Sequence, residues 1–254
     1  MPVLLLSHCS SPHYPRESNV YAPAPSTSAR VEDRSVAKSR PGLGTQLGGE
    51  LPDSSRAAAF YRQSSGGPDA VGMFHYNDDE GARLMAGLQG HPVRRSGAFD
   101  LVPGKLRVSV TDGYWRSSKT LDHYEAGQGF FVMGSPGRSY ALKLENRTNR
   151  RMEVVISVDG LDLLDGKPAS VKKPGYIIPA KSSVIVQGMR VGGKLFSLEF
   201  GAVSQARAAT AFGQKGARNV GVVGMACYEE DEAARRRVQV EEIYVREGAR
   251  AFGS

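Results

Sequence analysis

From about residue 99 onward, the chain is a succession of short apolar or alternating segments separated by turn residues. Successive side chains on a strand point to opposite faces, so this alternation is typical of strands with one buried face. Glycine, aspartate and asparagine between the segments favour tight turns. The segments expected to be strands are 105–111, 129–134, 139–146, 151–160, 175–179, 182–188, 194–201, 219–230 and 238–245.

The short connections between these segments favour antiparallel neighbours, because parallel strands need long crossover connections. Two segments, 78–90 and 203–213, have the start and stop residues of short helices. We therefore expect a mainly antiparallel all-β fold, either a β-sandwich or a jelly-roll, with one or two short helices.

Two neighbouring segments have the clearest expected facing. In the first, Lys143 and Glu145 point outward and three apolar residues point inward; in the second, Glu153 points outward and four apolar residues point inward. The residues expected to face inward are Tyr140, Leu142, Leu144, Met152, Val154, Ile156 and Val158. Because only the polar turn 146–149 separates the two segments, we expect them to form a hairpin.

The first 70 residues have a different composition, since 26 of them are proline, serine or glycine. Such a segment has too little apolar surface to offset its conformational entropy by itself. We expect residues 1–70 to form an extended arm that becomes ordered on a neighbouring subunit. Residues 71–98 are expected to be a transitional segment with one short helix, and residues 99–254 the β-sandwich domain.

The net charge is +7, and the part from residue 99 onward contributes +6 of it. A positive field favours acidic partners, although a solvated basic surface explains the same composition. The two arginine clusters, 147–151 and 235–237, lack the aromatic pairs or basic helix of a nucleic-acid module, so nucleic acid is not the expected partner. The apolar run 3–6 is too short for a signal peptide, and no membrane-spanning run is present, so we expect neither.

Three carboxylates, Asp159, Asp162 and Asp165, lie close together in a segment that also contains two glycines. Carboxylates at this density could bind a hard cation, but the spacing is not that of an EF-hand loop. The alternative is two successive tight turns whose aspartates bind local backbone amides. We favour the turns, and we expect no metal, cofactor or catalytic residue in the chain.

The remaining candidate sites are weaker. The chain has two cysteines, Cys9 and Cys227, which excludes a disulfide framework. Cys227 with His123 is a conceivable nucleophile pair, but its apolar surroundings favour an inert buried thiol. The sequence 146–148 fits a glycosylation acceptor, which is discounted without an export signal. A group of aromatic and basic residues could form a binding surface or plug one end of the sandwich: Tyr114, Trp115, Arg116, Lys119, His123 and Tyr124.

Several strings in the second region resemble a set of uncharacterised β-rich proteins of bacteria and tailed phages. They are RSYALKLENRTNRRMEVVISVDGLDLLDGKPAS, GYIIPAKSSVIVQGMR, FSLEFG and RNVGVVGMACYEE. The resemblance covers about residues 100–230, and its best-defined stretches are 156–170 and 217–226. It implies a β-rich domain in a virion or surface assembly, and it implies no catalytic role.

We therefore expect a non-enzymatic structural protein of a tailed-phage virion, assembled in the host cytoplasm. Its role would be capsid decoration or reinforcement, with the arm and the basic β-domain docking on a protein lattice of capsid or other virion subunits and on copies of itself. One alternative is a bacterial surface-binding module with an unstructured stalk. A less favoured alternative is a carbohydrate-acting enzyme that uses two of the carboxylates Asp159, Asp162, Asp165, Glu199 and Glu229.

Overall fold

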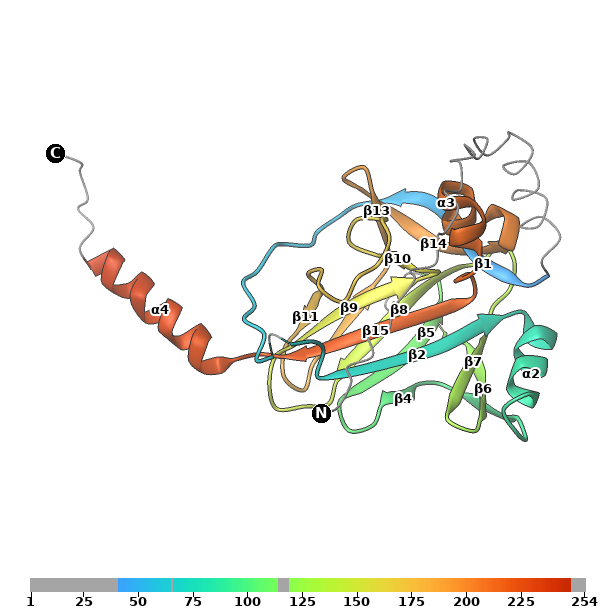
Figure 1. Ribbon diagram of the computed structural model, residues 1–254, viewed down its shortest axis with the longest axis horizontal. Helices are drawn as coiled ribbons and strands as arrows, with labels where there is room; N and C mark the ends of the chain where they lie inside the picture. The colour runs from blue at the N-terminus through green and yellow to red at the C-terminus, as the bar shows by residue number, and fades with distance from the viewer. Residues whose placement is uncertain (1–40, 65, 114–118, 248–254) are drawn as a thin grey trace, which may run out of the picture.

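The computed structural model describes residues 41–64, 66–113 and 119–247 of the chain. Two sheets face each other, as Figure 1 shows. The main apolar core lies between them. The all-β, mainly antiparallel fold expected from the sequence is confirmed, and the layers are those of a sandwich. The jelly-roll alternative stays a prediction.

The first sheet has seven strands, all in antiparallel pairs. These strands are β1 (Leu43–Leu51), β4 (Phe99–Val102), β5 (Leu106–Asp112), β8 (Ser139–Asn146), β12 (Ser183–Val186), β13 (Gly188–Val191) and β14 (Lys194–Ala202). Their order is β1-β14-β8-β5-β4, with β12 beside β8 and β13 beside β14.

The second sheet has eight strands in the order β10-β9-β15-β2-β7-β6-β3, with β11 beside β9. These strands are β2 (Ala70–Asn77), β3 (Val93–Ser96), β6 (Asp122–Ala126), β7 (Gly129–Met133), β9 (Met152–Val158), β10 (Leu161–Asp162), β11 (Tyr176–Ile178) and β15 (Val222–Glu229). β2 and β7 run parallel, and the other pairs are antiparallel. β15 therefore lies between two strands that come much earlier in the chain.

The hairpin predicted for residues 139–158 is wrong. β8 pairs with β5, β12 and β14 in the first sheet, whereas β9 pairs with β10, β11 and β15 in the second. The facing of the two strands is nevertheless as predicted, because Leu142 and Leu144 from β8 meet Val154 and Ile156 from β9 in the same buried core. A hairpin and a crossover between two facing sheets require the same alternation, so the pattern alone does not distinguish them.

The boundary predicted at residue 70 is also wrong. β1 pairs with β14 from Leu43 opposite Ala202 to Leu51 opposite Leu195, and Leu43 belongs to the core. Gly44, which interrupts the apolar pattern of β1, has a packing role: a Cβ on it would lie 2.6 Å from side-chain atoms of Ala206 and Val220. The segment 71–98 likewise supplies β2 and β3 to the second sheet. The part of the predicted arm before residue 41 lies outside the described residues.

Residues 60–63 lie along the outside of the second sheet, where Phe60 packs on Val155, Ala226 and Tyr228 and Arg62 fixes the segment. The Arg62 guanidinium donates to Glu153 Oε2 at 2.6 Å and lies 3.7 Å above the centre of the Tyr228 ring. Glu153 was predicted to face solvent, but this segment covers it and leaves only 5% of its surface exposed. The buried carboxylate is paired, since it also accepts from Gly175 N at 2.8 Å.

The first predicted helix is confirmed as α2 (Asp79–Gly87), with Asp78 as its N-cap residue accepting from Gly81 N at 2.7 Å. Its two buried alanines pack on β6 and β7. The second predicted helix begins as a short 3-10 turn (Val203–Gln205) and continues as α3 (Arg207–Ala217). Gly213, expected to end this helix, forms a kink within it at φ 59°.

The strand predicted at residues 238–245 is wrong, because these residues belong to the helix α4 (Glu232–Glu247). Asp231 caps the helix, with its Oδ1 accepting from the amides of Ala233 and Ala234 at 2.9 Å. Two ion pairs at helical spacing, Arg236 with Glu232 and Arg246 with Glu242, support it further. The alternation at Val238 and Val240 suggested a strand, but helix formers dominate the segment.

Candidate protein-docking surface

The three clustered aspartates do not form a metal site. Asp162 Oδ1 accepts from Leu164 N at 2.8 Å, and Asp165 accepts from Lys167 N at 2.9 Å and pairs with Lys173. Within the described parts of the chain, no group of three or more His, Cys, Asp or Glu residues is placed to hold a metal ion. The turn interpretation is therefore confirmed for Asp162 and Asp165.

Asp159 behaves differently, because its side chain points into the core. Its Oδ2 accepts from Thr45 N at 2.7 Å, and its Oδ1 accepts from the Tyr76 hydroxyl at 2.6 Å and from Gly221 N at 2.9 Å. The Thr45 hydroxyl lies 2.8 Å from the Tyr76 hydroxyl and 2.6 Å from that of Tyr140. This group, called the buried aspartate network here, joins β1 and β8 of the first sheet to β2 and the turn after β9 in the second.

Burial determines the acid–base properties of the network. It raises the pKa of Asp159 to about 6, while the hydrogen-bond donors around the carboxylate oppose this rise. Burial also raises the pKa of Tyr76 and Tyr140, so both phenols stay protonated at neutral pH. The network has a donor for each aspartate oxygen, so it can act as a polar cross-link between the sheets.

The stability of the protein is expected to depend on the titration of Asp159. Its pKa rises from 3.8 to about 6 on folding, so the folded state binds more protons than the unfolded state between these values. Its contribution to stability is therefore present below about pH 4 and falls as the pH rises through 6. The stability of wild type relative to Asp159→Asn should fall by on the order of 3 kcal/mol between pH 4 and pH 7.

Urea unfolding of both proteins at several pH values measures this difference in the free energy of unfolding. Subtracting the value of the asparagine variant cancels the contribution of every other titrating group. A difference that stays constant or grows with pH would contradict the assignment.

Cys227 and His123 do not form a pair. His123 lies on β6 and Cys227 on β15, with β7 and β2 between them, which separates the strands by about 14 Å. Burial raises the pKa of the Cys227 thiol to about 12, as expected for an inert buried cysteine. The His123 ring packs against Phe99 and Phe130, so it is part of the apolar interior.

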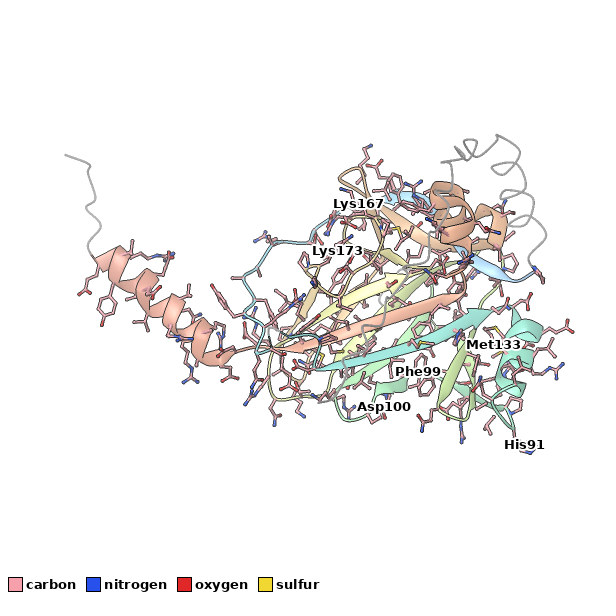
Figure 2. The ribbon with its side chains drawn as sticks, in the orientation of Figure 1. His91, Phe99, Asp100, Met133, Lys167 and Lys173 are labelled. Carbon is pink, nitrogen blue, oxygen red and sulfur yellow. The ribbon has the colours of Figure 1, made fainter. Side chains whose placement is uncertain are left out.

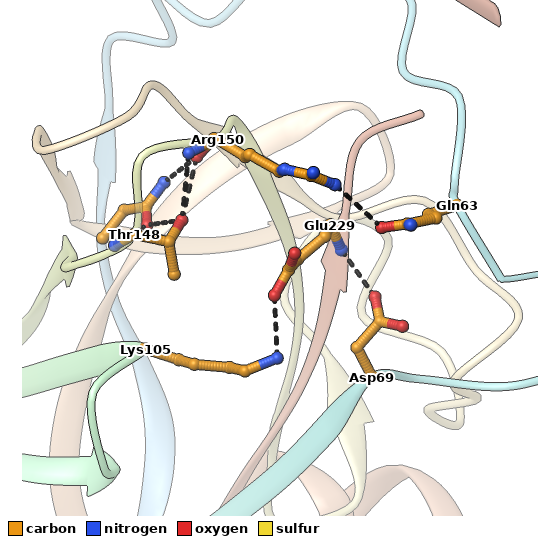
Figure 3. Close-up of polar contacts among 7 residues, drawn as sticks. Gln63, Asp69, Lys105, Thr148, Arg150 and Glu229 are labelled. Atoms are coloured by element: carbon orange, nitrogen blue, oxygen red, sulfur yellow. Dashed lines mark hydrogen bonds and ion pairs between the residues drawn. The ribbon is translucent and has the colours of Figure 1, made fainter. Parts of the chain in front are cut away.

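The other candidate carboxylates are engaged separately. As Figure 3 shows, Glu229 pairs with Lys105 at 2.7 Å, and its backbone amide donates to Asp69. Glu199, on the other sheet, accepts from the side-chain amide of Gln46 at 2.6 Å. These acids do not converge on one cleft with Asp159.

Asn146, the first residue of the possible glycosylation sequence, is fully buried. Its side-chain amide donates to the carbonyls of Arg150, Ile178 and Pro179, at 2.7, 3.1 and 3.1 Å. Its Oδ1 accepts from Thr148 N at 2.9 Å. The asparagine therefore organises the crossover from β8 to β9, a role that the sequence pattern did not reveal.

The predicted aromatic surface is only partly visible. Residues 114–118 lie outside the described residues. His123 and Tyr124 are buried on β6, and the Tyr124 hydroxyl donates to Asp79 at the start of α2. Lys119 precedes the strand and is exposed. These three residues therefore do not form a common surface.

Among the described elements, helix α4 has few contacts with the rest of the molecule. It extends away from the sandwich (Figure 1), and its side chains are exposed to solvent along most of its length (Figure 2). None of its residues is buried. Five large apolar side chains are 41% to 76% exposed: Val238, Val240, Ile243, Tyr244 and Val245. The described helices include none with the length and hydropathy needed to cross a membrane.

One side of α4 overhangs the segment that leads to Arg62. A groove of about 450 Å³ separates them, with Ala59, Tyr61 and Arg151 on its domain side. Arg235, Gln239 and Glu242 contribute polar groups from the helix side. At the base of the helix, the buried Glu230 pairs with both Arg151 and Arg235. Among the described residues, the polar contacts between this helix and the rest of the domain thus lie at its first turn.

A second, smaller apolar strip lies on the outer face of the eight-stranded sheet. Val71 and Met73 of β2 are 64% and 54% exposed there. Beside them, a hollow of about 170 Å³ is lined by Val155, Ala226 and Gly224. Isolated exposed apolar residues are common, so this strip has less weight than α4.

Comparison of the chain with protein-family models, with curated proteins and with solved structures finds no match.

Proposed function

We propose that this chain is a non-enzymatic structural subunit of a larger protein assembly and that α4 is one of its docking elements. The observation that supports this most directly is a 16-residue helix with no buried residue and five exposed large apolar side chains. An isolated helix of this length is marginally stable in water, and helices are stabilised mainly by packing of an apolar face. A partner protein on α4 would supply that packing.

The assembly that we propose is a tailed-phage virion, in which the chain would decorate or reinforce the capsid. Two features are consistent with this role. The sandwich is a compact module in which the candidate carboxylates are paired or buried rather than gathered in a cleft. The net charge of +7 also favours docking on an acidic protein lattice. The docking role of the N-terminal segment stays a prediction, because residues 1–40 lie outside the described part.

Sedimentation of the native protein tests this function. A lysate of cells that produce the native protein is separated on a sucrose gradient. The chain should sediment with particles many times heavier than its own 27.3 kDa. A variant with Val240, Ile243 and Tyr244 changed to serine should lose this association, because the exposed apolar side chains of α4 are removed.

The matched control changes Leu88 and Val93 to serine, since these apolar residues are also exposed but lie near α2 and β3. The control should still sediment with the particles. Native protein that sediments as a free chain, or equal behaviour of both variants, would contradict the proposed function.

A further inference from the structure

The residues of α4 divide into two faces. The face toward the groove consists of Arg235, Val238, Gln239, Glu242, Ile243 and Arg246. The opposite face contains four residues at the three–four spacing of a helical stripe, flanked by two valines. This outer stripe consists of Ala234, Arg237, Glu241 and Tyr244, with Val240 and Val245 beside it.

The charges along α4 are unevenly distributed. Arg235, Arg236 and Arg237 lie in its first half, where Glu232 offsets one of them. Glu241, Glu242 and Glu247 lie in its second half, where Arg246 offsets one of them. The helix therefore has a basic half followed by an acidic half. Two such helices attract each other when they run antiparallel and repel each other when they run parallel.

We infer that the partner of α4 is a second copy of α4, paired antiparallel about a two-fold axis at the level of Gln239. This inference rests on the proposed function, in which α4 is a docking element, and it names the partner. In this arrangement Arg237 of one copy faces Glu241 of the second copy, and the two-fold axis repeats the pair. Ala234 then faces Tyr244 of the second copy, so a small side chain lies opposite a large one.

Two observations support this register. Among the described residues, Arg237 and Glu241 have no ion-pair partner, whereas the neighbouring Arg236 and Glu242 are paired within their own helix. The valines on the flanks, Val240 and Val245, are 48% and 76% exposed and would be covered by the second helix. A two-fold interface of this kind uses the same surface on both copies and closes at two.

The paired helices alone make a small interface, so the dimer should be reversible. Interfaces below about 1,200 Å² are typical of weak complexes, and we expect a Kd on the order of 10 µM. In a larger assembly, other contacts would add to this pairing through high local concentration.

Sedimentation equilibrium of the full chain over a range of micromolar concentrations tests the inference. The wild type should reach twice the mass of one 27.3 kDa chain. Arg237→Glu should weaken the dimer at least about tenfold, because it places like charges opposite each other twice. Glu241→Arg should do the same. The double variant R237E/E241R restores both pairs, and its Kd should return to within about threefold of the wild type.

Arg236→Glu is the matched control, since it makes the same charge change one position away and outside the outer stripe. Its dimer should be as strong as that of the wild type within about threefold. A wild type that stays monomeric, a dimer that Arg237→Glu leaves intact, or a double variant that stays as weak as the single variants would each overturn the inference.

The test of self-pairing and the test of the proposed function can give different results. A monomeric wild type whose native form still sediments with large particles would mean that α4 docks on a different protein, which overturns only the self-pairing. The purified protein could instead form a dimer that is sensitive to these charge changes, while the native protein sediments free of particles. That result would support the self-pairing and contradict the proposed function.

Discussion

Replacing Asp159 by alanine is expected to lower the free energy of unfolding by about 4 kcal/mol. The substitution leaves the amides of Thr45 and Gly221 without an acceptor, and the Tyr76 hydroxyl loses one of its two partners. A buried donor without an acceptor costs roughly 1–3 kcal/mol. Because domains of this kind have only about 5–15 kcal/mol of stability, a loss of this size would be visible as a large shift of the urea midpoint.

Asp165→Ala is the control for this prediction, because it removes a carboxylate from the same loop. The Asp165 side chain is 38% exposed, and its ion pair with Lys173 is at the surface. Surface pairs contribute about 1 kcal/mol or less, so the midpoint should change little. Equal losses for the two variants would mean that the buried aspartate network does not hold the sheets together.

Ile156→Asp is expected to cost on the order of 4 kcal/mol or more, enough to unfold much of the protein. Ile156 lies on the inward face of β9 with 2% of its surface exposed, and it belongs to the main core. The buried carboxylate would have no cation beside it in this apolar core. Thermal unfolding followed by circular dichroism measures the loss, and the variant should melt far below the wild type.

The adjacent Ser157→Asp is the matched control, since Ser157 lies on the outward face of the same strand beside an open hollow. Its melting temperature should lie within a few degrees of that of the wild type. If both variants melted alike, the assignment of the inward face of β9 would be incorrect.

The sequence predicted the local features of this fold better than its pairing. The inward positions of β8 and β9 follow from strict alternation, so Leu142, Leu144, Val154 and Ile156 could be assigned without a structure. Which strands pair depends on contacts far apart in the chain, and alternation has no information about them. The crossover at Asn146 and the pairing of β1 with β14 were missed for this reason.

The sequence analysis missed the docking surface on α4 for a different reason. The valines at 238 and 240 alternate as in a strand, yet the charges that pair at 232 with 236 and at 242 with 246 have helical spacing. Reading the charges before the apolar residues would have indicated a helix. The buried partners of Asp159 could not have been found in this way, because Thr45, Tyr76 and Gly221 come from three distant segments.

The position of β15 also has a consequence for how the protein is made. This strand lies between β9 and β2, and among the described strands it is the last to leave the ribosome. Until it emerges, β2 and β9 have no bridge between them, and the nascent chain carries two unfinished sheet edges. We therefore expect the sandwich to close only near the end of translation, just before α4 becomes available to a partner.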